Sequence, residues 1–72
     1  MNISYYDFKN LSDFTQCQMV LNQGQLMEER TVDKLKYVLY QISSFSVEII
    51  YNTTSEKIAA VNVYQNRAIY AQ

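Results

Sequence analysis

The chain has 72 residues, 49% of them hydrophobic, and its six Lys or Arg against seven Asp or Glu give a formal net charge of −1. The basic residues are scattered, and this argues against nucleic acid as a partner, because nucleic-acid-binding proteins cluster their positive charge. No apolar stretch approaches the roughly 20 residues of a membrane span, and the first residues lack the long apolar centre of a signal peptide, so we expect a cytoplasmic protein without a membrane partner.

The length predicts a single domain, residues 1–72. A domain this short buries only about 60% of the surface that its unfolded chain exposes, and its core alone rarely supplies more than about 3–5 kcal/mol of stability. Cys17 is the only cysteine and there is no histidine, so an internal disulfide is excluded and a structural zinc site is disfavoured. We therefore expect no metal and no cofactor, and association with another chain is the leading source of added stability.

The first part of the domain, residues 4–22, has the pattern of helices. Ser4 followed by Asp7 resembles a capping box, which marks a helix start. Ser12 is a second candidate for a helix start. The segment is therefore either one bent helix or two short helices broken near residues 10–12, and we favour two.

The second helical segment carries an apolar stripe. Phe14, Cys17 and Leu21 have the i, i+3, i+7 spacing of one helix face, and Val20 lies off it. We therefore expect this stripe to face the core. Gly24, the only glycine, stands where a left-handed C-terminal cap is expected.

The remainder of the domain predicts a β-meander over residues 25–64, followed by a C-terminal tail at 65–72. Runs of β-branched and aromatic residues predict four antiparallel strands at 26–32, 35–42, 45–51 and 58–64. The tail either packs on the domain or forms a fifth strand at 67–70. The predicted fold class is α+β, with short N-terminal helices packed on one face of a four-stranded antiparallel β-meander.

The two central strands are joined by Ser43 and Ser44 alone, and this fixes their register. A two-residue turn places Ile42 opposite Phe45 and continues the pairing along both strands. One face of this hairpin is then almost free of polar atoms, and we expect it to be the core face. Its members are Val38, Tyr40, Ile42, Phe45, Val47 and Ile49, with Ala59, Val61 and Val63 of the last strand beside them.

The opposite face of the sheet is mixed but has an apolar centre. Single exposed apolar side chains are ordinary on protein surfaces, whereas a contiguous group with aromatic residues and a polar rim is typical of a binding surface. We favour the second interpretation, also because tyrosines, of which the chain has seven, suit interfaces. The predicted protein interface is Tyr37, Leu39, Ile50, Ile58 and Tyr64.

The sequence offers no convincing catalytic group, so we predict a non-enzymatic protein. Glu28 and Glu29 are adjacent on a strand and point to opposite faces. Glu48 is better explained by a cross-strand ion pair with Arg30 than by acid–base chemistry. Cys17 has no histidine to activate it and lies on an apolar helix face.

Three functions remain, all based on binding. The favoured one is a homodimer, because two-fold dimers are the commonest oligomers and two sheets packed face to face bury the apolar centre. The alternative is a small inhibitor or adaptor that binds another protein through the same face or a free edge strand. Nucleic-acid binding by base stacking on tyrosines is the least favoured.

Three segments resemble a pattern in small bacterial proteins of unknown function: residues 24–30, 38–41 and 45–49. In that pattern, short N-terminal helices are followed by an antiparallel meander, and the resemblance covers about residues 4–64. It implies a bacterial cytoplasmic origin and this fold. It implies no activity and transfers no functional residue.

Overall fold

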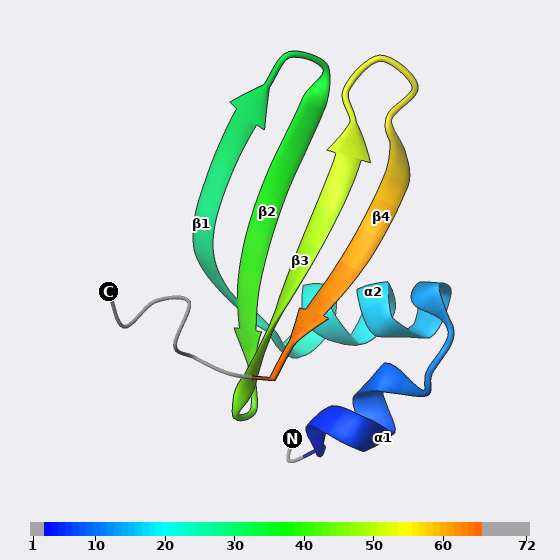
Figure 1. The fold of residues 1–72 in the computed structure, drawn as a ribbon, viewed down its shortest axis with the longest axis vertical. Helices are drawn as coiled ribbons and strands as arrows, with labels where there is room; N and C mark the ends of the chain where they lie inside the picture. The colour runs from blue at the N-terminus through cyan, green and yellow to red at the C-terminus, as the bar shows by residue number, and fades with distance from the viewer. Residues whose placement is uncertain (1–2, 66–72) are drawn as a thin grey trace.

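The computed structural model describes residues 3–65, which form two helices followed by four strands (Figure 1). The strands make one sheet in the order β1-β2-β3-β4, and each neighbouring pair is antiparallel. The predicted α+β class and four-stranded meander are confirmed, whereas the suggested strand at 67–70 lies outside the described residues. The elements are α1 Tyr5–Lys9, α2 Asp13–Gln23, β1 Gln25–Val32, β2 Leu35–Ile42, β3 Phe45–Asn52 and β4 Lys57–Tyr64.

Each helix begins at a serine that caps it, which confirms two short helices in place of one bent helix. The Ser4 hydroxyl accepts a hydrogen bond from the backbone N–H of Asp7 at 3.0 Å. The Ser12 hydroxyl accepts one from the backbone N–H of Thr15 at 3.2 Å. These bonds satisfy N–H groups that have no partner inside the helix.

Gly24 ends α2, but the predicted left-handed cap is wrong. Its φ of −78° and ψ of 157° are extended, and its N–H donates to the Val20 carbonyl at 2.8 Å. A Cβ at this position would lie 2.6 Å from the same carbonyl oxygen. Glycine is required here because the backbone of α2 approaches closely, and the chain turns directly into β1.

The central hairpin has the predicted register. Ile42 lies opposite Phe45, and the pairing continues without interruption to Leu35 and Asn52. Ser43, the first residue of the turn, has a φ of 54°. Positive φ at this position is typical of two-residue hairpin turns, whose twist matches that of the strands.

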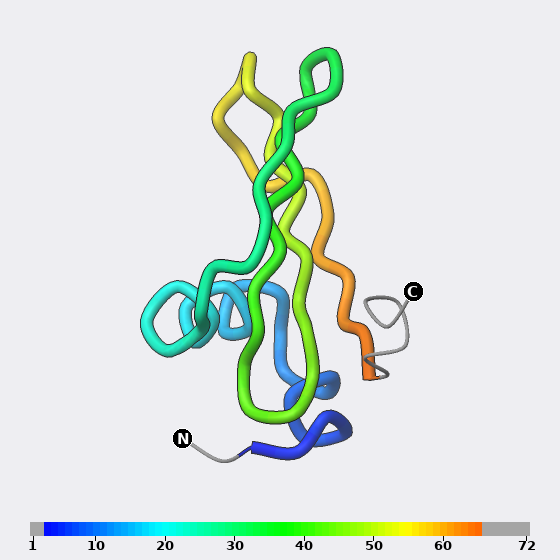
Figure 2. The backbone as a smooth tube through the Cα atoms, turned by 90° about the vertical axis from the view of Figure 1, so that its left-hand side faces the viewer, coloured from blue at the N-terminus to red at the C-terminus, as the bar shows by residue number. Residues whose placement is uncertain are grey.

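The core lies between the helices and one face of the sheet. Figure 2 shows α2 alongside this face and α1 beside the β2–β3 turn. The ring of Phe8 in α1 packs on Phe45, with 5.1 Å between their centroids. The buried amide of Gln16 in α2 donates to the Phe8 carbonyl at 3.0 Å and so ties the two helices together. The buried apolar cluster consists of Phe8, Cys17, Val20, Ile42, Phe45, Val47 and Ile49.

The face that α2 turns to the sheet differs from the predicted stripe. Phe14 and Leu21 are 72% and 56% exposed, whereas Cys17 and Val20 are buried. Apolar residues lie on two adjacent faces of this helix, so their spacing alone does not select the inner one. The tight turn at Gly24 selects it, because it brings the Val20 end of α2 against the sheet.

A β-bulge in β4 changes which side chains share a face. Ile50 lies opposite Ala60, but the next residue, Tyr51, lies opposite Ile58, so Ala59 is an extra residue on β4. The bulge turns Ile58 to the side of the sheet that faces α2. The predictions that Ala59 joins the core and that Ile58 lies on the opposite face are therefore wrong.

Candidate protein interfaces

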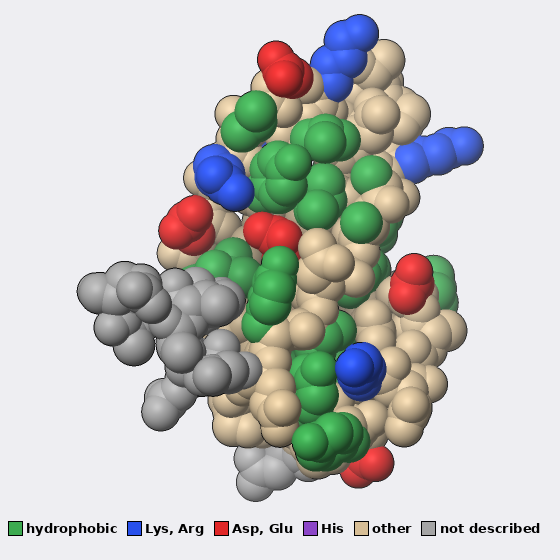
Figure 3. All heavy atoms as spheres, viewed as in Figure 1, with side chains coloured by type: hydrophobic (Ala, Val, Ile, Leu, Met, Phe, Trp, Pro, Cys, Tyr) green, Lys and Arg blue, Asp and Glu red, His purple; other side chains and the backbone are tan. Residues whose placement is uncertain are grey.

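The open face of the sheet, which is the face turned away from α2, carries four of the five predicted interface residues. Figure 3 shows hydrophobic side chains gathered on its upper half, with charged side chains of both signs around them. Tyr37 and Ile50 are directly paired across β2 and β3, and Leu39 is two residues from Tyr37 on the same face. We call Tyr37, Leu39, Ile50 and Tyr64 the sheet strip; each of them is half-buried.

Polar contacts lie beside and within the sheet strip, because Glu48 is paired directly with Leu39. The guanidinium of Arg30 lies over the ring of Tyr37, 5.0 Å from its centroid. The carboxylate of Glu48 accepts hydrogen bonds from the Tyr64 hydroxyl at 3.2 Å and from the Asn62 amide at 3.4 Å. The predicted ion pair between Arg30 and Glu48 is wrong, because β2 separates their strands.

Ser46 is the most buried residue of the open face. It is 1% exposed, and it lies opposite Tyr64 in the pairing of β3 with β4. Among the described residues 3–65, its hydroxyl has no hydrogen-bond partner. An unpaired buried hydroxyl costs about 1–3 kcal/mol, so this position is a local weakness of the fold.

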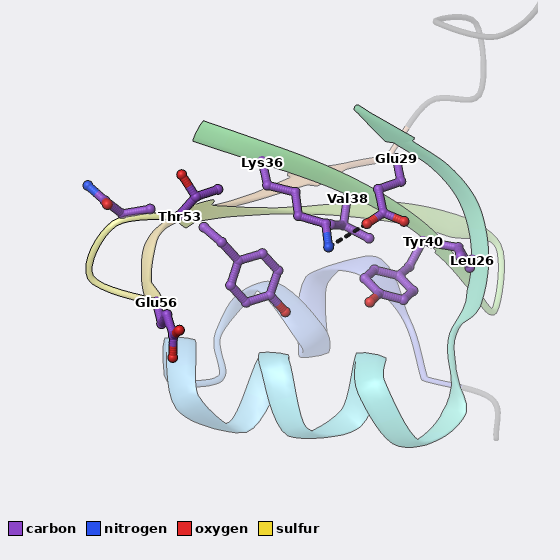
Figure 4. Close-up of a pocket in the computed structure, with 9 residues that line it drawn as sticks. Leu26, Glu29, Lys36, Val38, Tyr40, Thr53 and Glu56 are labelled. Carbon is purple, nitrogen blue, oxygen red and sulfur yellow. Dashed lines mark ion pairs between the residues drawn. The ribbon is translucent and has the colours of Figure 1, made fainter. Parts of the chain in front are cut away.

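On the other side of the sheet, a hollow of about 430 Å³ remains where α2 does not cover the strands (Figure 4). A salt bridge of 2.5 Å joins Lys36 to Glu29 on its wall, and the hydrogen bond to Glu29 raises the pKa of Lys36. Burial is the main cause that raises the pKa of Tyr40 and of Tyr51. The lining residues of this tyrosine hollow are Leu26, Glu29, Lys36, Val38, Tyr40, Tyr51, Asn52, Thr53 and Glu56.

Two phenols and one ion pair lie on the wall of the tyrosine hollow. Both phenols stay protonated at neutral pH, and the one ammonium on the wall is paired with a carboxylate. The sequence placed Tyr40 correctly on the helix side but gave no indication of the hollow. The hollow lies where the strands extend beyond α2, because α2 crosses only the lower part of the sheet (Figure 1).

A second hollow, of about 350 Å³, lies between α2 and β4. Phe14 and Leu21 line it from the helix and Ile58 lines it from the strand, so the bulge supplies one of its walls. Burial, with a smaller contribution from the charge of Asp13, raises the pKa of Cys17, so its thiol is not an activated nucleophile. We call this site the α2 hollow; it is lined by Asp13, Phe14, Cys17, Gln18, Leu21 and Ile58.

The α2 hollow was not predicted as a site, although the sequence contains its signal. Phe14 and Leu21 were assigned to the core because of their spacing, and Ile58 was assigned to the open face. Within residues 3–65, no group of three or more His, Cys, Asp or Glu side chains could hold a metal ion. In the same part of the chain, neither helix has the length and apolar character needed to cross a bilayer.

Comparisons with protein-family models, with curated proteins and with solved structures found no match to this chain. Its function must therefore be inferred from the surfaces described above.

Proposed function

We propose that the protein is a non-enzymatic interaction module that forms a homodimer through the sheet strip. The observation that carries this proposal is the apolar group at the centre of the open face, formed by Tyr37, Leu39 and Ile50. A contiguous apolar surface with a polar rim is typical of protein interfaces. Arg30 on the edge strand and Glu48 opposite Leu39 give the open face both signs of charge, so a two-fold axis that places Arg30 of one copy against Glu48 of the other would pair them.

The dimensions of the molecule suit such a dimer. Its four strands have eight residues each, so at about 3.3 Å per residue and about 4.8 Å between strands the open face measures about 26 by 19 Å. A specific interface of standard size uses about 800 Å² of each partner. Most of the open face would therefore be buried, and two antiparallel sheets would pack face to face as in a β-sandwich.

The substitution Leu39→Asp tests the proposal. Each dimer would then contain two buried carboxylates without partners, and we expect the dissociation constant to rise at least about 100-fold, equal to about 2.8 kcal/mol. Thr31→Asp is the matched control, because it adds the same charge to an exposed position on the helix-facing side of β1. Native mass is measured by sedimentation or light scattering across micromolar concentrations.

Two results contradict the proposal. The first is a wild-type protein that stays monomeric at high micromolar concentration. The second is a Leu39→Asp variant that folds and dimerises like the wild type. A monomer that forms a stable complex in a pull-down from its native host would favour the inhibitor or adaptor function, and salt-sensitive retention on heparin would favour nucleic-acid binding.

A further inference from the structure

Three large apolar side chains that are exposed to water meet at the α2 hollow. Phe14 is 72% exposed, Leu21 is 56% exposed and Ile58 is 44% exposed. They come from two elements that are far apart in the sequence, and together they line one concavity. Scattered exposed apolar residues need no explanation, but a convergent group around a hollow is typical of a binding site.

The outer surface of α2 is also unusual in charge. Asp13 is the only charged residue of the helix, so no charge occurs from Phe14 to Gln23. A helix face that only meets water normally carries charged side chains. The uncharged surface of α2 lowers the desolvation cost of covering it with another protein.

The hollow has the size of a pocket for one or two side chains. Its volume of about 350 Å³ lies at the lower end of the range for ligand pockets, about 300–1,000 Å³. Phe14 and Leu21 are two helical turns apart and form its helix wall, and Ile58 forms the opposite wall. Asp13 supplies the only charge among the lining residues.

We propose that the α2 hollow binds a short segment of a different protein. The segment inserts one large apolar side chain between α2 and Ile58 and places a Lys or Arg beside Asp13. Charge decides between this occupant and a second copy of the chain. A second copy that packs hollow against hollow offers no basic residue among the lining residues, so both Asp13 carboxylates would be covered without a cation.

The test is selection of a displayed library of random 12-residue peptides on the full-length chain. Counter-selection uses the double variant Phe14→Ser, Ile58→Ser, whose fold is checked by circular dichroism. We expect the enriched peptides to share a bulky apolar residue with a Lys or Arg nearby. The best peptide is then synthesised, and its affinity is measured by calorimetry.

Single variants show where that peptide binds. Ile58→Ser should weaken binding more than about ten-fold, because it removes one wall of the hollow. Asp13→Asn should weaken it about three-fold, as expected for an exposed ion pair. The matched control is Asn22→Ser, an exposed α2 residue outside the hollow, which should leave the affinity unchanged.

Several results would overturn the inference. The first is that every selected peptide also binds the double variant. The second is that the enriched peptides contain no basic residues. The third is that the best peptide binds Ile58→Ser as tightly as it binds the wild type. A native mass that falls to that of a monomer in Ile58→Ser would assign the hollow to a second copy. Leu39→Asp separates this inference from the homodimer, because a monomeric Leu39→Asp protein should still bind the peptide.

Discussion

The close approach at Gly24 gives the sharpest prediction about the fold. In Gly24→Ala the new Cβ would lie 2.6 Å from the Val20 carbonyl oxygen, which is 0.8 Å short of the 3.4 Å where ordinary contact begins (3.4 − 2.6). It would also lie 3.3 Å from a Val20 methyl and 3.4 Å from the Tyr40 Cβ, so two directions of relief are blocked. The clashing atom is backbone, and it can move only if the end of α2 moves.

The magnitude follows from two opposing effects. Overpacking of this kind costs about 1–3 kcal/mol. The backbone angles of Gly24 are open to alanine, so the smaller entropy of the unfolded chain returns about 0.4–1 kcal/mol. We expect a net loss of about 1–2 kcal/mol, a large share of the roughly 4–11 kcal/mol typical of a chain this long.

Urea unfolding followed by circular dichroism measures this loss. With a slope of about 1 kcal/mol per molar urea for a small protein, the midpoint should fall by about 1–2 M. Asn22→Ala, at an exposed position in the last turn of α2, is the control and should not be destabilised.

A second substitution tests the reason for the glycine. Asparagine tolerates a left-handed cap, so Gly24→Asn would be nearly harmless if the residue served as one. In the extended conformation its Cβ meets the same Val20 carbonyl, and we expect it to cost at least as much as alanine. A Gly24→Asn protein with stability close to that of the wild type would refute the close-approach argument.

Two other predictions concern buried polar groups. Ser46→Cys replaces an unpaired hydroxyl by a less polar thiol, so the free energy of unfolding should stay the same or rise by about 1 kcal/mol. A fall of about 1 kcal/mol would mean that the hydroxyl has a hydrogen-bond partner. The pKa values of Tyr40 and Tyr51 are raised, so the native state keeps these phenol protons to a higher pH than the unfolded chain does. The free energy of unfolding should therefore fall as the pH rises above the ordinary tyrosine pKa of 10.0. Urea unfolding at pH 9 and at pH 10.5 should show this fall, and the double variant Tyr40→Phe, Tyr51→Phe should reduce it; Lys36, whose pKa is also raised, stays as a background of the same sign in both proteins.

The central hairpin was predictable because local signals decide it. A two-residue turn between two apolar runs leaves one register that places Val47 and Ile49 together on an apolar face, and a shift by one residue would bury Glu48. The helix starts were predictable for a similar reason. Ser4 and Ser12 cap the helices through hydrogen bonds to residues only three positions away.

The inner face of α2 was not predictable from its own sequence. Its apolar residues occupy two adjacent faces, and the choice between them depends on contacts outside the helix. Gln16 shows this most clearly, because a glutamine at a helix centre reads as exposed. Here its amide is buried and donates to the carbonyl of Phe8, eight residues earlier. A polar residue inside the core requires such a partner, and only the packed structure reveals it.

Part of the candidate interfaces could likewise be predicted from the sequence, and part could not. Tyr37, Leu39 and Ile50 were assigned to one face by alternation along β2 and β3, where no bulge interrupts the pairing. Ile58 was assigned to the wrong face because the alternation of side chains fails at a bulge. Neither Ala59 nor its neighbours in β4 are glycine or proline, the residues that often mark a bulge. No single residue type in β4 predicts this bulge. Its position depends on how β4 packs against β3 and α2.

The position of that bulge determines how the apolar side chains are divided between the two sides of the sheet. With strict alternation in β4, Ile58 would extend the apolar group of the open face, and α2 would lack an opposite wall for Phe14 and Leu21. The extra residue at Ala59 moves one large side chain across the sheet, so the open face keeps a smaller apolar group and a hollow is completed on the helix side. Because the two surfaces then lie on different sides of the sheet, a dimer formed through the sheet strip would leave both α2 hollows accessible. Such a dimer would bind two copies of a partner segment, and linkage of those copies would raise the apparent affinity without any new contact.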